Sequence, residues 1–338
     1  MAEGDRTGEA DGARPRLRAF RGGATVRAGW QPRELARRLA TLEQQVESAL
    51  EGRGAAGVAG VPPVVGEAID EALAGYARLR RWLFGDVGEV DGGLPSIGLR
   101  ALYRYWWRVD ARGLERIPDH GRVLIVANRS AALLPYDALM LPVALALDHP
   151  THRRVHPLVD ERLIAMPLIG ALFGRLDALT AAPGTLRRLL QDEEAVIVFP
   201  EGRVAATKPF GQRYRVGRFG RPSALRVAIE TGTPIVPVGV IGAEETQPVL
   251  ARVGGLERLG IPPLPVTPTF PWLGPWGLLP LPTKWTIHAG DALDVAAEYP
   301  AGQANDPAAV RRLRDQVRER LQGVVSEGLR RRRGLFSG

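Results

Sequence analysis

The sequence has 338 residues and a formal net charge of +8, and its basic residues are all arginine except Lys208 and Lys284. It has no cysteine, which excludes disulfide bonds and thiolate metal sites, and no run of about twenty apolar residues that would span a membrane. The five histidines do not adopt a metal-ligand spacing, so we expect no metal site. An arginine excess suits an anionic partner, although a GC-rich coding sequence would produce the same excess.

The first part of the chain is expected to form an appendage. Residues 1–28 lack hydrophobic periodicity, and we expect them to be disordered. Residues 29–95 are expected to be helical, because apolar residues recur every three or four positions on both sides of a Gly- and Pro-rich linker. These helices would pack on the main domain or bind a partner or membrane. No signal peptide is recognisable, so we expect a cytoplasmic protein, peripheral at the inner membrane face.

Residues 97–109 combine aromatic rings and arginines at helical spacing. The segment contains Tyr103, Tyr105, Trp106 and Trp107 interleaved with Arg100, Arg104 and Arg108. Amphipathic rings beside cations suit the headgroup region of a membrane, and we expect membrane contact here. Packing of the rings in the core is the alternative. Stacking on nucleic-acid bases is a third use of such residues, but we expect no nucleic-acid partner.

Residues 123–141 give the clearest strand-and-turn signal of the chain. The uncharged run Val123–Val126 is typical of a strand buried on both faces. Polar residues follow it directly, namely Asn128, Arg129 and Ser130, and then an apolar segment in which Asp137 is the only charge. Open α/β sheets build their sites from polar side chains that follow strands in this way.

Two further strands of this kind follow. One, Ala195–Phe199, leads into Pro200, Glu201 and Gly202, and the other is Ile235–Ile241. Because the carboxyl ends of such strands meet at one edge, we expect Asn128, Arg129, Asp137 and Glu201 to converge there. Residues 203–229 hold seven basic residues and no acidic one. We expect this run to capture a phosphate group, with a solvated charged face as the alternative.

The remaining elements complete a mixed sheet with helices. We expect strands over 154–159 and 283–290 and a helix over 184–194, while the apolar residues 163–173 would line the core or an acyl-chain groove. The proline-rich residues 261–282, with Trp272 and Trp276, cannot form a continuous helix, and would cover that groove or enter a membrane interface. A last helix would begin after the cap residue Asp306 and end in the basic run 330–333.

These segments, in this order, resemble the lysophospholipid and glycerolipid acyltransferase family, whose type member acts on 1-acylglycerol-3-phosphate. That family's motifs include Asn-His followed by Asp, then Phe-Pro-Glu-Gly, then a Val-Pro strand. Phe199–Gly202 matches in full and Ile235–Val238 matches well. In the first motif Arg129 stands where the family has His, and seven residues instead of four separate it from Asp137. The resemblance covers roughly residues 96–295.

The resemblance implies a mixed central β-sheet flanked by helices over residues 96–300, with 301–338 as a basic C-terminal helix. It implies transfer of an acyl group from acyl-CoA or acyl carrier protein to the hydroxyl of a lysophospholipid or glycerol-type acceptor, without another cofactor. Residues 176–183 offer no arginine where the family has a phosphate-binding one, which argues against a glycerol phosphate acceptor. The alternatives are a catalytically impaired homologue that binds lipid or acyl chains, and a membrane-associated interaction protein.

By the same resemblance, the expected catalytic residues are Asp137, Glu201 and Arg129 at the position of the family's His. The expected substrate-binding residues are Asn128, Ser130, Gly202, Arg203, Lys208 and Arg213. Arginine cannot act as a general base at neutral pH, because the guanidinium keeps its proton up to about pH 12. We therefore expect Arg129 to form an ion pair with Asp137. Either Asp137 or Glu201 then takes the proton directly, or the protein does not catalyse the transfer.

Overall fold

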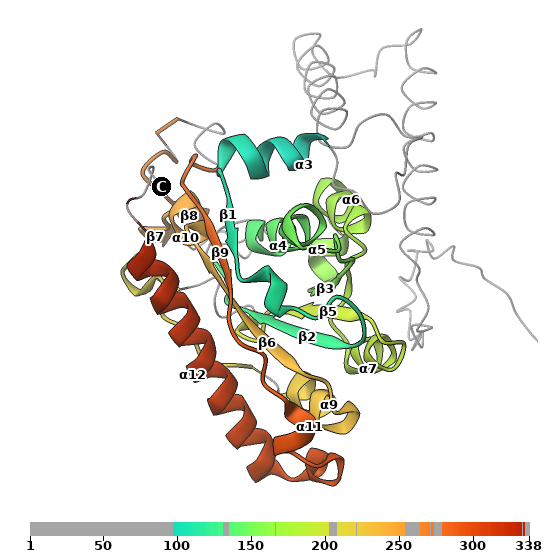
Figure 1. Cartoon of the computed structure of the whole chain (residues 1–338). Helices are drawn as coiled ribbons and strands as arrows, with labels where there is room; N and C mark the ends of the chain where they lie inside the picture. The colour runs from blue at the N-terminus through green and yellow to red at the C-terminus, as the bar shows by residue number, and fades with distance from the viewer. Residues whose placement is uncertain are drawn as a thin grey trace, which may run out of the picture. The chain divides into compact units, whose positions relative to one another are not determined.

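The computed structural model describes part of the chain, and every described residue belongs to one of its two compact units, residues 32–338 (Figure 1). The described residues are 97–130, 135–165, 167–202, 208–220, 222–253, 264–270, 272–273, 279–332 and 334. The expectations of a disordered segment at 1–28 and of helices at 29–95 lie outside these residues.

A seven-stranded mixed sheet forms the centre of this unit, which confirms the predicted fold class. Its strand order is β1-β9-β6-β2-β5-β3-β4. The strands are β1 (Asp110–Arg112), β2 (Val123–Ala127), β3 (His156–Val159), β4 (Leu179–Thr180), β5 (Ala195–Val198), β6 (Ile235–Ile241) and β9 (Thr286–Ala289). Strand β2 lies parallel to β5 and β6, whereas β9 runs antiparallel to β6. A separate two-stranded sheet pairs β7 (Ala251–Val253) with β8 (Leu264–Val266).

Helices cover both faces of the sheet. They are α3 (Ile97–Ala101), α4 (Tyr136–Asp148), α5 (Glu161–Ala165), α6 (Pro167–Arg175), α7 (Pro183–Gln191), α9 (Ser223–Thr231), α10 (Ala243–Thr246), α11 (Val295–Glu298) and α12 (Pro307–Arg331). Shorter turns are the π-helix η1 (Leu102–Trp106) and the 3₁₀ turns η2 (Leu114–Arg116), η3 (Phe210–Gln212) and η6 (Ala301–Asn305). None of these helices combines the length and the apolar character that crossing a bilayer requires.

The central strand β2 shows why both faces need cover. Its five residues are all buried, and they alternate between two hydrophobic clusters. Ile125 packs in the cluster that α4 contributes to, whereas Leu124 packs in the cluster that contains the apolar residues of α7, α9 and α12. A strand without a polar face is stable only between two layers, so the continuous apolar run Val123–Val126 predicts this arrangement.

The last helix, α12, is part of the core. The Asp306 carboxylate accepts hydrogen bonds from the backbone N–H groups of Ala308 and Ala309 at 2.8 and 3.2 Å, which confirms the predicted cap. One side of the helix packs on β6 and β9 and buries Leu313, Val317 and Leu321. Its C-terminal end lies at the end of β6, since a Cβ atom at Gly328 would lie 2.6 Å from the Ile241 side chain.

The aromatic segment 97–109 divides between core and surface. Tyr103 and Trp107 are fully buried, and the Trp107 ring stacks on Trp285 with 4.6 Å between the ring centroids. Tyr105 is 80% exposed and Trp106 is 41% exposed. The expectation of membrane contact for the whole segment is therefore wrong for Tyr103 and Trp107, because residues four apart on this turn face the sheet together.

Candidate active site

The candidate site lies where β2 and β5 end. These strands are parallel neighbours, so the residues that follow Ala127 and Val198 leave the sheet at the same edge. The turn after β2 carries Asn128, Arg129 and Ser130, and the turn after β5 carries Glu201. The predicted convergence of these residues with Asp137 is found, and hydrogen bonds connect them.

Asn128 extends the sheet with its side chain. The amide nitrogen Nδ2 donates to the carbonyl of Val240 at 3.0 Å, and Oδ1 accepts from the N–H of Val240 at 2.7 Å. The residue is 3% exposed, so its amide replaces the backbone pair that a further strand residue would form. Both polar atoms are used within the fold. Asn128 therefore fixes the end of β2 and the direction of Arg129.

Glu201 joins three segments of the chain. Its Oε1 accepts a hydrogen bond from the backbone N–H of Arg129 at 3.0 Å, and its Oε2 accepts from the N–H of Gly217 at 2.7 Å. A Cβ atom at position 217 would lie 2.7 Å from Oε2, so any larger residue there would have to displace the carboxylate or the loop. The carboxylate is 2% exposed and holds the turn after β2 against the loop at 208–220.

Asp137 lies in the first turn of α4 and is fully buried. Its Oδ2 accepts from the N–H of Ser130 at 2.7 Å, and its Oδ1 accepts from the N–H of Ala138 at 2.9 Å. Free backbone N–H groups and the helix dipole favour a carboxylate at this position. The Oδ2 atom also lies 4.0 Å from Nε of Arg129, the expected ion pair.

Arg129 is the member of this set that a ligand reaches first. Its side chain is 15% exposed, whereas that of Asp137 is 0% exposed. The guanidinium carbon lies 5.3 Å from the centroid of the Phe199 ring, so the ring supports the cation from one side. A substrate oxygen that approaches the site therefore meets a positive charge, with the Asp137 carboxylate behind it.

Ser130 brings an unsatisfied hydroxyl to the same place. The residue is 2% exposed, and its Oγ has no hydrogen-bond partner among the residues that the structure describes. A buried hydroxyl without a partner costs about 1–3 kcal/mol, so fold stability does not account for it. A bound molecule with an oxygen or N–H group at this position would satisfy it.

The basic residues that the sequence assigns to substrate binding differ in their surroundings. Lys208 is 2.5 Å from Oε1 of Glu244 and also donates to the carbonyl of Arg215 at 3.1 Å, and its side chain is 9% exposed. It neutralises a buried carboxylate instead of facing solvent. The guanidinium of Arg213 lies 4.6 Å from the ring centroid of Phe210. Gly202 adopts a left-handed conformation with φ of 57°, and Arg203 lies outside the described residues.

Sequence reasoning missed Glu244. It follows β6 in α10, and its Oε2 accepts from the backbone N–H of Tyr214 at 2.6 Å. Burial raises the pKa of its carboxyl group, and Lys208 opposes that shift. Together these contacts fix the loop that holds Glu201. The available signal was an acidic residue directly after the third buried strand, the same position that singles out Glu201 after the second.

The chain is similar to known proteins over much of its length. A family model described as Acyltransferase matches residues 108–241. An uncharacterized protein of Mycobacterium tuberculosis is 40% identical over 276 residues, which cover 79% of this chain and 76% of that protein. An uncharacterized protein of Mycobacterium leprae is 39% identical over 276 residues, covering 79% and 74%.

The chain is also similar to one plant protein and to one solved structure. The chloroplastic phytyl ester synthase 2 of Arabidopsis thaliana is 26% identical over 139 residues, which are 40% of this chain and 20% of that protein. Among solved structures, the 1-acyl-sn-glycerophosphate acyltransferase PlsC of Thermotoga maritima is similar with a TM-score of 0.41 and 19% sequence identity. That likeness covers 77% of this chain and 90% of the other.

Proposed function

Since the chain belongs to the acyltransferase family, we propose that it transfers an acyl group from a thioester to the hydroxyl of a lysophospholipid or glycerol-type lipid. The observation that carries this proposal is the meeting of Arg129, Asp137 and Glu201 where β2 and β5 end. It supplies a cation and a carboxylate side by side, the charges that acyl transfer needs. The name of the Arabidopsis relative, an ester synthase, accords with an ester as the product.

In the proposed reaction the acceptor hydroxyl oxygen attacks the carbonyl carbon of the thioester. Its proton passes to Asp137, and the negative charge that develops on the carbonyl oxygen lies next to the guanidinium of Arg129. The tetrahedral intermediate then collapses, the C–S bond breaks, and the leaving thiolate takes the proton from Asp137. The products are an ester and a free thiol, and both residues return to their starting state.

Arg129 would assist this reaction as a cation and hinder it as a barrier. Its side chain lies on the exposed side of the pair, so an acceptor hydroxyl must displace it slightly to reach the buried Asp137. Both Asp137 oxygens already accept hydrogen bonds from the N–H groups of Ser130 and Ala138, so an acceptor hydroxyl must share an oxygen that is already occupied. We therefore expect slow turnover.

Acyl-CoA and acyl carrier protein are the proposed donors. Both present a thioester on a phosphate-bearing arm, and exposed cations near the site would attract that phosphate. We propose the exposed arginines of the basic run for this contact, among them Arg213, whose guanidinium lies over the Phe210 ring. Because a lipid acceptor resides in membranes, we further propose that the protein acts as a peripheral protein at the inner, cytoplasmic membrane face.

A second candidate function is binding of acyl chains or lipid without turnover. It is favoured by the same ion pair, because the motif resemblance implies that Arg129 stands where the family has its His. In addition, both oxygens of Glu201 are committed to backbone N–H groups, so this carboxylate is a structural support first. The two candidates differ in one measurable product, the free thiol.

The experiment that tests the proposal measures thiol release from acyl-CoA by the purified protein, with and without lysophospholipid. The proposal expects slow release that the acceptor stimulates, together with a matching amount of newly acylated lipid. Acyl carrier protein replaces acyl-CoA in a parallel assay to identify the donor. Acyl-CoA or lipid binding without thiol release from either donor would reject catalysis and support the second candidate.

A further inference from the structure

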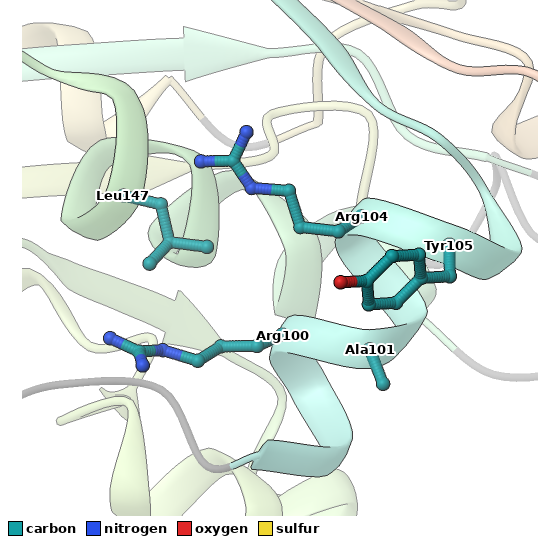
Figure 2. Close-up of a pocket in the computed structure, with 5 residues that line it drawn as sticks. All are labelled: Arg100, Ala101, Arg104, Tyr105 and Leu147. Carbon is teal, nitrogen blue, oxygen red and sulfur yellow. The ribbon is translucent and has the colours of Figure 1, made fainter.

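A pocket of about 480 Å³ lies beside the aromatic segment, and none of its lining residues belongs to the candidate active site. It is lined by Arg100, Ala101, Arg104, Tyr105 and Leu147 (Figure 2). The first four residues belong to α3 and η1, and Leu147 belongs to the last turn of α4. In Figure 2 both arginine side chains extend from the same side of the helical segment, toward Leu147.

The inner face of this segment holds it rigidly, which gives the pocket a fixed wall. Leu99, Tyr103 and Trp107 are buried, and the Tyr103 hydroxyl donates to Oδ2 of Asp148 at 2.5 Å. The indole nitrogen of Trp107 donates to the carbonyl of Leu281 at 3.2 Å. With the inner face anchored at both ends, the residues between project outward and cannot turn into the core.

The pocket carries a net positive charge. Arg104 forms an ion pair with Asp148 at 2.9 Å, but its side chain is still 54% exposed. Arg100 is exposed and forms no hydrogen bond or ion pair with any residue in the described part of the chain. The pocket is therefore lined by two guanidinium groups, of which one is paired with a carboxylate, and a guanidinium without such a partner is suited to a phosphate oxygen.

Apolar side chains surround this charge in the manner of a membrane interface. Tyr105 is 80% exposed beside the arginines, and the neighbouring Trp106 is 41% exposed. The Trp106 indole donates to the carbonyl of Pro280, next to Leu279, which is 55% exposed. An amphipathic ring beside a cation and an exposed leucine suits the boundary between phospholipid headgroups and acyl chains.

The sheet places this surface at the edge where the candidate site opens. Strand β1, which follows the aromatic segment, begins opposite Thr286 at the start of β9. The start of β9 pairs in turn with Ile241 at the end of β6, and β6 runs parallel to β2. A membrane that contacts Tyr105 and Trp106 would thus lie at the same edge of the sheet as Arg129.

We propose that the pocket between α3 and α4 binds the phosphate headgroup of an anionic membrane phospholipid, with Arg100 as its main contact, and thereby docks the protein on the membrane. Arg100 and Arg104 would hold the phosphate while Tyr105, Trp106 and Leu279 enter the interface. This is a docking site and takes no part in acyl transfer. The expected ligand is a lipid within a bilayer, because the exposed rings and Leu279 have no role in binding a free anion.

Co-sedimentation of the full chain with vesicles of phosphatidylcholine, with and without phosphatidylglycerol, tests this proposal without any turnover. We expect binding to the anionic vesicles only, and weaker binding as salt rises. Arg100→Ala should weaken it about fivefold and Arg100→Glu about 25-fold, since each arginine near an anionic surface contributes about 1 kcal/mol. Both variants should keep the wild-type thermal unfolding midpoint, because Arg100 is exposed.

The matched control is Arg311→Ala, which removes an exposed arginine from the N-terminal part of α12, at the other end of that helix from its contact with the end of β6 (Figure 1). If Arg100→Ala and Arg311→Ala weaken vesicle binding equally, the proposal is overturned, because general charge attraction would then explain the binding. A different result is that glycerol phosphate binds in solution in a way that depends on Arg100, while the protein shows no preference for anionic vesicles. That result would assign the pocket to a free phosphate and would also overturn the proposal. The proposal would be supported if Arg100→Ala, but not Arg311→Ala, weakens vesicle binding and if glycerol phosphate in solution does not bind.

Discussion

The Nε atom of Arg129 lies 4.0 Å from Oδ2 of Asp137, so a cation and a carboxylate lie side by side in the segment that resembles the Asn-His and Asp motif of the acyltransferases. The buried carboxylate has a counter-charge, and the guanidinium beside it cannot act as a base at neutral pH. The proposed acyl transfer depends most directly on this pair.

Arg129→His should raise the rate of thiol release from acyl-CoA. An imidazole at this position accepts the hydroxyl proton, and general-base assistance is worth a factor of about 10²–10⁴. The ring must reach Asp137, whose Oδ2 is within ion-pair distance of the present side chain. Initial rates of thiol release with saturating acceptor provide the measurement.

Two control variants separate the imidazole from other effects of the substitution. Arg129→Gln removes the positive charge without supplying a base, and it should not raise the rate. Asp137→Asn in the Arg129→His protein should abolish the gain, since the ring loses its orienting carboxylate. Vigorous turnover by the wild-type protein would contradict this account, because the base would then lie elsewhere.

Ser130→Ala should lower acyl transfer without lowering stability. Its buried Oγ has no partner among the described residues, so removing it relieves a cost of about 1–3 kcal/mol in the free protein. If the hydroxyl bonds to substrate, KM should rise or kcat should fall. Urea unfolding and steady-state kinetics measure the two effects separately. A variant that is less stable and fully active would assign the hydroxyl to the fold.

Gly217→Ala should disrupt the support of Glu201. The added Cβ would lie 2.7 Å from Glu201 Oε2, so the carboxylate or the loop must move. We expect a loss of roughly 1–3 kcal/mol in the free energy of unfolding, together with reduced acyl transfer. Gly211→Ala in the same loop is the control, because a Cβ there meets no atom within 4 Å. If the two variants lose equal amounts of stability and of acyl transfer, the contact between Gly217 and Glu201 has no special role.

Lys208→Met should destabilise the protein by about 3–5 kcal/mol at neutral pH, because it leaves the Glu244 carboxylate buried and unpaired. Burial already raises the pKa of Glu244 above its ordinary 4.5, and loss of Lys208 raises it further. As pH rises past 4.5, the unfolded carboxyl releases its proton before the folded one does. Stability therefore falls with rising pH in this window, and it falls further in the variant.

Urea unfolding of the wild-type and Lys208→Met proteins from pH 4.5 up to neutral pH measures this effect. The difference between their free energies of unfolding should grow as pH rises. The double variant Lys208→Met with Glu244→Gln should recover most of the loss, since no buried charge remains. If the free energies of unfolding of the two proteins differ by the same amount at every pH, the loss of stability does not come from the Glu244 carboxylate.

Local patterns predicted most of the elements that form the fold. The apolar run of β6 has the predicted bounds Ile235–Ile241, and the Asp306 cap is correct. These features depend on residues close in the sequence, where periodicity and capping chemistry act directly. The meeting of Arg129 and Glu201 was also predictable, because parallel strands bring their carboxyl ends to one edge.

The partners of the site residues could not be predicted in this way. Asn128 was expected to bind substrate, but its amide pairs with Val240, 112 positions further along the chain. Lys208 was expected to face a phosphate, but it pairs with Glu244. Both partners are chosen by the order of strands in the sheet, which no local pattern specifies. Each choice turns an expected ligand contact into a support of the fold.

The loop that holds Glu201 depends on residues that are synthesised much later. The Val216 N–H donates to Gln322 Oε1 at 2.8 Å, and the Tyr214 hydroxyl accepts from Arg332 at 3.1 Å. At about 5–20 residues per second, a ribosome needs about 5 to 20 seconds to proceed from this loop to α12. The sheet can form before then, but the loop cannot acquire these bonds. Assembly of the site is thus among the last events in the making of this protein, and nascent chains that stop before α12 should remain inactive even if their sheet has folded.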